Sequence, residues 1–354
     1  MNIPAKAIAA VADHGGSLGR ARSLFPHAPE PWVDLSTGIN PHSYPLFDLP
    51  ATALTRLPEP ARARDLAAVA AKAYGAPSPR HVALAPGTQI LLPRVFSLVK
   101  PGRAAILGPT YAEHARTAAL CGHTVIETSN FSALAEVDVA VVVNPNNPDG
   151  RVISRTDLLA LAEMLRKRGG VLVIDEAFMD VGPREQSLCG DVEQGGIVVL
   201  RSFGKFFGLA GVRLGFAVAS PDIAERLDGE FGPWSVSGPA LEYGIQALGD
   251  SGWQDAMRDR LEAETERLDA LLARHGIAVD GGTSLFRHVT SHDAGGLFDA
   301  LGKAGILVRN FADRLHQLRF GLPGEEGEWE RLEMALTMWS ASKRGGSVRA
   351  VASR

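Results

Sequence analysis

Residues 201–216 read RSFGKFFGLAGVRLGF, and Lys205 lies in the middle of this largely apolar stretch. Burying an ammonium group without a partner is costly, so a lysine in such surroundings tends to lose its proton. A neutral amine is a nucleophile, and the chemistry it suits is condensation with an aldehyde. The alternative is a lysine whose stem lies along apolar surface while its ammonium group stays in water. The rest of the sequence decides between the two.

Short apolar runs alternate with helical patterns on both sides of this stretch. The runs predicted to be buried strands cover residues 82–85, 104–107, 124–127, 139–143, 171–174, 197–200 and 214–218. Helices are predicted between them at residues 66–74, 90–99, 112–120 and 156–168. Strands that are apolar on both faces and alternate with helices indicate an α/β fold, with a mostly parallel seven-stranded sheet between helices. Such sheets bind ligands at the carboxyl ends of their strands.

The pattern changes near residue 251, where a long charged helix is predicted over residues 253–275. The elements predicted after it are strands at 284–289, 306–311 and 317–322 and helices at 294–304 and 328–342. We therefore expect a large α/β domain over residues 46–250 and a small α+β domain formed by residues 1–45 and 251–342. Residues 343–354 mix basic residues with Gly, Ser and Ala, which predicts a disordered tail.

The composition of the 354-residue chain excludes several classes of protein. Its net charge of −4 predicts no nucleic-acid partner. Cys121 and Cys189 show no metal-ligand spacing, which predicts no metal site, no disulfide scaffold and a reducing compartment, the cytoplasm. The apolar run near the N-terminus lacks the core of a signal peptide, and no stretch reaches the length of a membrane helix. A membrane partner is therefore not expected.

Polar residues follow several of the predicted strands. Asp175 ends the apolar run 171–174, where a buried carboxylate needs a cationic partner, such as a protonated pyridine nitrogen. Alternatively, it caps the next helix. Residues 144–148 read Asn-Pro-Asn-Asn-Pro, which specifies a turn. An asparagine amide held in that turn can donate a hydrogen bond to a phenolate oxygen.

A glycine turn opens the helix that follows the first predicted strand. Residues 85–89 read Ala-Pro-Gly-Thr-Gln, and the backbone amides at a helix N-terminus form an anion site. Ser202 and Arg213 can add a hydroxyl and a guanidinium to the same phosphate. Alternatively, Gly87 and Thr88 mark only the entry of the helix. An amine, a pyridine partner, a phenolate donor and a phosphate site are together what pyridoxal 5′-phosphate needs.

The order Asn-Pro-Asn-Asn-Pro, Asp-Glu-Ala-Phe and Ser-Phe-Gly-Lys, followed by Gly-Leu-Ala-Gly-Val-Arg, resembles the fold-type-I aminotransferase superfamily over residues 14–321. It is most similar to the histidinol-phosphate aminotransferase branch. The cofactor-binding residues that this resemblance implies are Gly87, Thr88, Tyr111, Asn147, Asp175, Ser202, Lys205 and Arg213. Among them, Lys205 is the implied catalytic residue, which carries the cofactor, and Tyr111 stacks on its ring. Arg319 is implied to bind the substrate carboxylate; alternatively, it is an ordinary cation at a strand edge.

Two stretches select within the branch. His14-Gly15-Gly16 with residues 34–41, and Arg-Leu-Pro-Glu-Pro at residues 56–60, look like the threonine-phosphate decarboxylases of cobalamin biosynthesis. That resemblance implies decarboxylation of L-threonine O-3-phosphate to (R)-1-amino-2-propanol O-2-phosphate and CO2. The implied substrate-binding residues are His14, Gly15, Asn40, Asn147 and Arg319. His14 with the neighbouring glycine amides can form a pocket for the substrate phosphate, although His-Gly-Gly can also be a simple turn.

Two positions depart from the aminotransferase pattern. Phe178 stands where these enzymes usually have a tyrosine that bonds the phenolate oxygen, and Leu57 stands where a tyrosine often reaches the cofactor of the neighbouring subunit. The resemblance still implies a homodimer. Two alternatives to the decarboxylase remain: a histidinol-phosphate or related aminotransferase, and a non-enzymatic effector-binding module. Decarboxylation and transamination differ in which bond of the substrate lies perpendicular to the cofactor ring, a difference in geometry that the residues alone do not reveal.

Overall fold

The computed structural model describes residues 14–351, with side chains through Lys343. They form two compact units: a large unit of residues 43–256, and a small unit of residues 14–42 and 257–351. The large unit begins before residue 46 and ends after residue 250, slightly outside the predicted limits, because Tyr44 and Trp253 both belong to it. The Tyr44 N–H donates to the carbonyl of Phe207 (2.8 Å), and its ring packs against Trp253. The predicted positions of residues 1–13 and 352–354 lie outside the described residues.

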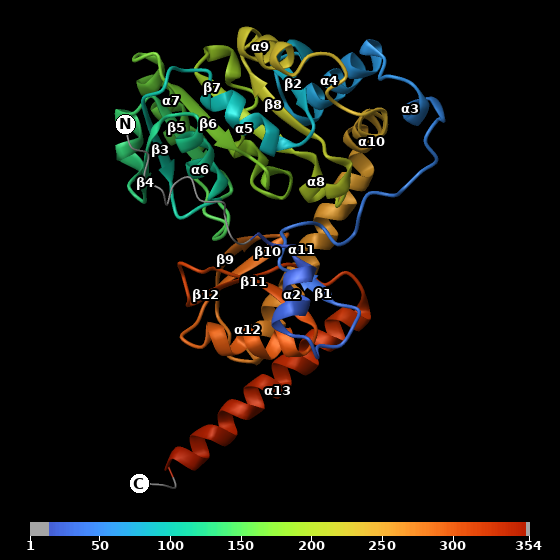
Figure 1. Cartoon of the computed structure of the whole chain (residues 1–354), viewed down its shortest axis with the longest axis vertical. Helices are drawn as coiled ribbons and strands as arrows, with labels where there is room; N and C mark the ends of the chain where they lie inside the picture. Colours follow the sequence, from blue (N-terminus) through green and yellow to red (C-terminus); the bar gives the residue numbers. More distant parts are fainter. Residues whose placement is uncertain (1–13, 352–354) are drawn as a thin grey trace. The chain divides into compact units, whose positions relative to one another are not determined.

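A seven-stranded sheet forms the centre of the large unit (Figure 1). In spatial order its strands are β2 (Val82–Ala85), β8 (Gly215–Ala219), β7 (Ile197–Ser202), β6 (Val171–Asp175), β5 (Val139–Val143), β3 (Arg103–Leu107) and β4 (Thr124–Thr128). Strands β3 to β7 run parallel, and β8 lies antiparallel to both β7 and β2. Every residue of β5, β6, β7 and β8 is buried. This explains their uninterrupted apolar sequences and confirms the predicted α/β fold.

Helices cover the sheet and complete the large unit. They are α3 (Thr52–Thr55), α4 (Pro60–Tyr74), α5 (Thr88–Phe96), α6 (Glu113–Leu120), α7 (Arg155–Arg166), α8 (Phe203–Phe206), α9 (Pro221–Phe231) and α10 (Gly238–Gly249). Short 3-10 turns occur at η1 (Pro79–His81), η2 (Phe131–Glu136), η3 (Met179–Val181), η4 (Arg184–Gln186), η5 (Val192–Gln194) and η6 (Ala210–Val212). Leu91, Leu92 and Phe96 of α5 pack with alternate strand residues such as Ile106 and Val141 in one apolar core. Burial of this apolar surface is the main force that holds α5, and the turn before it, against the strand ends.

The small unit is built on a five-stranded sheet (Figure 1). In spatial order its strands are β1 (Val33–Leu35), β11 (Ile306–Asn310), β12 (Gln317–Phe320), β10 (Phe286–Thr290) and β9 (Val279–Thr283). Its helices are α2 (Leu18–Leu24), α12 (Ala294–Lys303), α13 (Glu326–Val351) and α11 (Ser251–Arg274), the last of which begins in the large unit. Strand β1 pairs in parallel with β11, so this early segment belongs to the unit formed by the later half of the chain.

The predicted disordered tail is wrong for residues 343–351, because helix α13 continues through Val351. Two contacts hold the helix near its predicted end at residue 342. The Lys343 ammonium lies 2.8 Å from a carboxylate oxygen of Asp293, and it lies over the Trp339 ring at 4.2 Å. Once a helix is formed, adding further residues is much easier than starting it. The sequence alone shows neither contact.

Candidate active site

The residues predicted to bind a cofactor in the large unit lie at or just beyond strand ends. Asp175 is the last residue of β6 and Ser202 the last of β7, whereas Gly87, Tyr111 and Asn147 follow β2, β3 and β5. These five strands point in the same direction, because β2 is antiparallel to β8, which is itself antiparallel to β7. Their carboxyl ends therefore share one edge of the sheet, where α/β proteins bind ligands.

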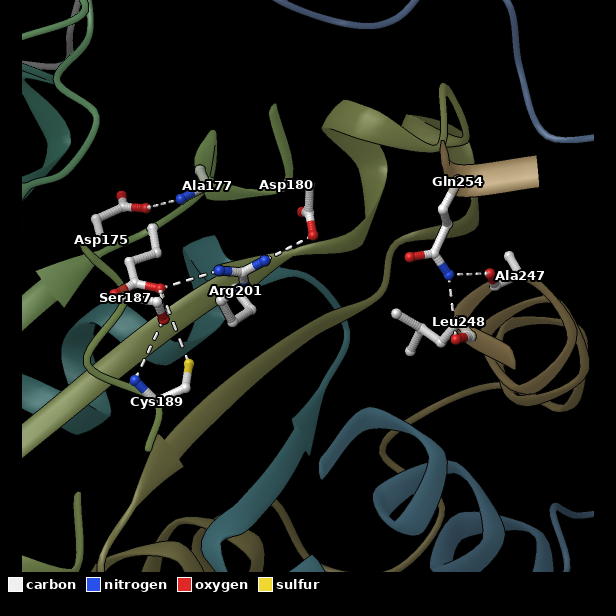
Figure 2. Close-up of polar contacts among 10 residues, drawn as sticks. Asp175, Ala177, Asp180, Ser187, Cys189, Arg201, Ala247, Leu248 and Gln254 are labelled. Atoms are coloured by element: carbon white, nitrogen blue, oxygen red, sulfur yellow. Dashed lines mark hydrogen bonds and ion pairs between the residues drawn. The ribbon is translucent and has the colours of Figure 1, made fainter. Parts of the chain in front are cut away.

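Asp175 is held by hydrogen bonds to both carboxylate oxygens. Its Oδ2 lies 3.0 Å from Nε2 of the fully buried His114. Its Oδ1 accepts the Ala177 N–H at 3.0 Å, as Figure 2 shows. Nδ1 of His114 has no hydrogen-bond partner among the described residues. Nε2 is therefore the ring nitrogen that donates to Asp175. The carboxylate is thus fixed in orientation at the end of β6.

Lys205 lies in the short helix α8, directly after Ser202. It is half-buried, and its Nζ lies 5.9 Å from the centre of the buried Phe178 ring. The surrounding helix contributes the buried rings of Phe203 and Phe206. The Lys205 amine therefore lies beside aromatic rings, where the position predicted for the cofactor-bearing residue places it.

Glycines bring the predicted phosphate ligands together. A Cβ placed on Gly87 would lie 2.6 Å from Nη2 of Arg213, and one on Gly215 would lie 2.6 Å from the backbone nitrogen of Thr88. Gly215 is also the register partner of Ser202 across β7 and β8. Helix α5 begins at Thr88, and no side chain caps its N-terminus. The start of α5, the Ser202 end of β7 and the Arg213 guanidinium therefore lie close together, an arrangement that fits the predicted phosphate site.

Tyr111 belongs to a chain of polar side chains. Its hydroxyl donates to Oε1 of Gln89 (3.1 Å), and Nε2 of Gln89 donates to Oε2 of Glu113 (3.2 Å). The Tyr111 ring meets the His114 ring edge to face at 5.7 Å. Burial raises the pKa of Tyr111 to about 12, so its hydroxyl stays protonated and acts as a donor at neutral pH.

The asparagines of the loop at residues 144–148 make different contacts. Asn144 forms reciprocal hydrogen bonds with the backbone of Ile153 (3.1 and 2.8 Å). Oδ1 of Asn146 accepts a hydrogen bond from the Thr110 hydroxyl (2.7 Å), and Nδ2 of Asn146 donates to the carbonyl of Pro109 (3.1 Å). These two residues build the turn, and they hold it against the loop that leads to Tyr111. Asn147, the predicted cofactor and substrate ligand, is half-buried at the end of this turn.

In the small unit, Ser36 joins two of the predicted substrate-binding elements. Its Oγ accepts the Gly16 N–H (2.7 Å), and its carbonyl accepts Nη2 of Arg319 (2.8 Å). A Cβ on Gly15 would lie 2.3 Å from that same carbonyl oxygen. His14, which is exposed, lines a small cavity together with Ser36 and Arg309. Ser36 therefore holds the turn at His14 close to Arg319. The Gly16 N–H already donates to Ser36, so it is engaged within the small unit.

Arg319 lies on the central strand β12 and is only 7% exposed, so it is not an edge cation. Burial, and then the cation of Arg309 opposite it on β11, lower the pKa of Arg319 to about 10, against the influence of Asp34. Asn40 is also buried, and its Oδ1 accepts the His42 N–H (2.8 Å).

Residues 55–332 match the family described as aminotransferase class I and II. The chain belongs to this family. A threonine-phosphate decarboxylase of Pseudomonas aeruginosa is 42% identical to it, over 92% of this chain and 97% of that protein. A histidinol-phosphate aminotransferase of Aeromonas salmonicida is 29% identical, over 80% of this chain and 83% of that protein.

The likeness extends to solved structures of the aminotransferase family. The histidinol-phosphate aminotransferase of Sinorhizobium meliloti, in complex with pyridoxal-5′-phosphate, matches with a TM-score of 0.73 at 22% identity. The match covers 82% of this chain and 85% of that one. The predicted fold-type-I architecture, with its large parallel sheet and small α+β unit, is therefore confirmed.

Sequence reasoning missed three residues of this site: His114, Gln89 and Arg201. Each has a local signal. His114 comes three positions after Tyr111, so one helical turn places both rings on the same side. Gln89 follows Gly87 and Thr88 directly, and Arg201 precedes Ser202. Their partners, however, lie far along the chain, and only the folded sheet brings them together.

Proposed function

We propose that this chain is a pyridoxal 5′-phosphate-dependent carboxy-lyase. It decarboxylates L-threonine O-3-phosphate to (R)-1-amino-2-propanol O-2-phosphate and CO2, as a step of cobalamin biosynthesis. One observation carries the proposal: the 42% identity to a threonine-phosphate decarboxylase spans nearly the whole of both chains, against 29% to a histidinol-phosphate aminotransferase.

The residues at the strand ends of the large unit fit this cofactor. When bound, pyridoxal phosphate supplies an aldehyde that takes up the substrate amine and a pyridinium ring that accepts the electron pair left by CO2. Lys205 would hold the aldehyde, and Asp175, oriented by His114 and the Ala177 N–H, would face the pyridine nitrogen. The phosphate would be bound by Gly87, Thr88, Ser202 and Arg213, whose approach the two glycines permit.

The residues of the small unit are proposed to select the substrate. Arg319 would bind the α-carboxylate, and His14 and Gly15 the phosphate, with Asn40 as an additional donor. In this reaction the bond between Cα and the carboxylate carbon breaks, CO2 leaves, and Cα gains a proton. The Lys205 side chain, in its ammonium form, is the proposed donor of that proton and would be left as the neutral amine. Rigid placement of the carboxylate by Arg319 would decide that this bond, and not Cα–H, is broken.

A homodimer in the cytoplasm completes the proposal. The large unit exposes several large apolar side chains, namely Leu46, Leu54, Leu57 and Trp234. These side chains are available for a contact with another chain, and the dimer itself is proposed from the family resemblance. Sedimentation analysis should therefore give the mass of two chains, and an active monomer would contradict this part of the proposal. Among residues 14–351, no helix is both long and apolar enough to cross a bilayer.

The direct test is to incubate the purified protein and pyridoxal phosphate with threonine phosphate, in the absence of any 2-oxo acid, and to measure CO2. We expect release of CO2 by the wild type and none by Lys205→Ala. Plain threonine should react on the order of 10⁴-fold less efficiently, because donors placed for a phosphate would be left unpaired. Efficient turnover of histidinol phosphate with 2-oxoglutarate, without CO2 from threonine phosphate, would instead establish an aminotransferase.

A further inference from the structure

Arg201, Glu176 and Asp180 form a buried ionic cluster in the large unit. Their exposed fractions are 4%, 0% and 6%. Figure 2 shows the contact between Arg201 and Asp180. Nη1 of Arg201 donates to Oε2 of Glu176 at 2.9 Å, and Nη2 donates to Oδ1 of Asp180 at 2.6 Å. One planar guanidinium therefore bridges two carboxylates, each through a different nitrogen. This fixed fork is a geometry that a lysine ammonium does not reproduce.

The three residues adjoin the candidate cofactor site in the sequence. Glu176 follows Asp175 directly, Arg201 precedes Ser202 directly, and Asp180 lies in η3. The cluster therefore fixes both ends of segment 176–180. Between these ends lie Ala177, whose N–H bonds to Asp175, and Phe178, whose ring lies beneath the Lys205 amine.

Glu176 is fixed by further hydrogen bonds. Its Oε2 accepts the Ser187 hydroxyl (2.6 Å), and its Oε1 accepts the Leu188 N–H (2.9 Å). Arg201 itself lies over the Tyr74 ring at 4.4 Å. The guanidinium thus has a defined position, set by groups from several segments. It transmits that position to the ends of two neighbouring strands.

General energetics do not explain such a cluster by stability alone. Replacing a buried ion pair with well-packed apolar residues is often neutral or stabilising, because the charges lose their hydration. A group of buried charges at the strand ends therefore calls for another role. Geometry supplies one: a bridge between two carboxylates determines distance and angle, which apolar contacts define less sharply.

We propose that Arg201 is a positioning residue for the cofactor: its bridge from Glu176 to Asp180 holds Asp175 and Ser202 in the relative placement that the ring and the phosphate require. This inference rests on the proposed function, since it concerns the same cofactor site. Asp175 would face the pyridine nitrogen and Ser202 the phosphate, and these lie at opposite ends of one rigid molecule. A shift of one strand end against the other would misplace one of the two contacts.

Arg201→Lys tests the proposal, because it keeps a buried cation but loses the planar fork that bridges the two carboxylates. We expect a folded protein whose dissociation constant for pyridoxal phosphate rises by about 10-fold and whose kcat falls by about 100-fold, as misplaced groups do. The absorption spectrum of the bound cofactor should also acquire a different pH dependence. Arg155→Met is the matched control, since it breaks another ion pair of this unit, with Asp191 (2.9 Å), that includes neither Glu176 nor Asp180. The control should change the cofactor dissociation constant by less than about twofold.

Three outcomes would overturn the proposal. The first is that Arg201→Lys binds the cofactor as tightly as the wild type and with an unchanged spectrum. The second is that Arg155→Met weakens cofactor binding as much as Arg201→Lys does. If Arg201→Lys does not fold, the neutral triple variant Arg201→Met, Glu176→Gln, Asp180→Asn takes its place, and cofactor binding equal to wild type would overturn the proposal. Cofactor affinity is measured without substrate, so failure of the wild type to release CO2 would reject the proposed function and leave this test intact.

Discussion

Arg201 of the large unit and Arg319 of the small unit are almost equally buried, with exposed fractions of 4% and 7%. Their charged neighbours differ: two carboxylates bind Arg201, whereas the cation of Arg309 lies beside Arg319. Burial alone lowers the pKa of Arg201, yet the carboxylates of Asp180 and Glu176 outweigh it and raise the pKa. For Arg319, burial and the cation of Arg309 act in the same direction and lower the pKa to about 10.

This difference distinguishes a structural charge from one suited to a ligand. Arg201 has its counter-charges inside its own unit, at 2.9 and 2.6 Å. Arg319 donates to the carbonyl of Ser36, and both the cation of Arg309 and the carboxylate of Asp34 act on it, the cation more strongly. A buried cation so placed gains most from an anion that arrives from solution. The comparison therefore supports the proposal that Arg319 binds the substrate carboxylate.

The largest expected effect is on stability. Arg201→Met leaves the Glu176 and Asp180 carboxylates buried without their cation, so the free energy of unfolding should fall by about 3–5 kcal/mol. Arg319→Met removes a cation from beside another and should change this free energy by less than about 1 kcal/mol. Urea unfolding followed by circular dichroism measures both. Equal losses in the two variants would break the comparison.

The next effect is on substrate recognition. Arg319→Met should lower kcat/KM for threonine phosphate by roughly 100-fold, the worth of a lost charge-assisted contact, and leave cofactor affinity unchanged. Arg331→Met is the matched control in the small unit, because Arg331 also donates to a backbone carbonyl, that of Pro31. Steady-state kinetics should show little change for the control. A comparable loss in both variants would argue against a specific role for Arg319.

The pKa of Arg319 predicts a pH limit on anion binding. Below about pH 10 the guanidinium is protonated and attracts a carboxylate; above it the charge, and hence the affinity, is lost. Binding of 3-phosphonopropionate, which has no amine to titrate, should weaken by up to about tenfold per pH unit above that point. Isothermal calorimetry can follow this, and Arg319→Gln should lack the step. A wild-type affinity that stays constant to pH 11 would contradict the prediction.

The smallest effect is expected where the polar contacts are exposed. Gln89→Leu removes the acceptor of the Tyr111 hydroxyl, and a hydrogen bond of this kind changes affinity by only about 2–10-fold. The dissociation constant for pyridoxal phosphate should rise by that factor. In a Tyr111→Phe background the same substitution should have no further effect, because the hydroxyl is already absent. An undiminished effect there would mean that Gln89 does not act through Tyr111.

The sequence predicted the large sheet well because its strands are continuous apolar runs, such as Val139–Val143, buried on both faces. It missed β1 and β9 because neither carries such a run: β1 has three residues, and β9 contains Gly281 and Gly282. Short or glycine-rich strands depend on their neighbours for stability, and those neighbours are distant in sequence.

In the candidate site, too, some residues could be predicted from the sequence and others were missed. Residues adjoining a strand end, such as Asp175 and Ser202, could be selected from the sequence, because parallel strands place their carboxyl ends together. His114 and Arg201 have only their positions near Tyr111 and Ser202 as a local signal, because their roles depend on contacts across 61 and 25 residues of chain. Helical and strand periodicities describe near neighbours, whereas these contacts follow from the strand order of the sheet.

The double anchoring of segment 176–180 has an evolutionary consequence. Glu176 and Asp180 are tied to one guanidinium, while Phe178 lies between them with its ring beneath the Lys205 amine. A mutation at position 178 can therefore alter the surroundings of that amine while the anchors preserve the path of the backbone. Selection, or a protein engineer, can vary the chemistry at this position without first redesigning the scaffold. The cluster thus makes the site evolvable by keeping its frame constant.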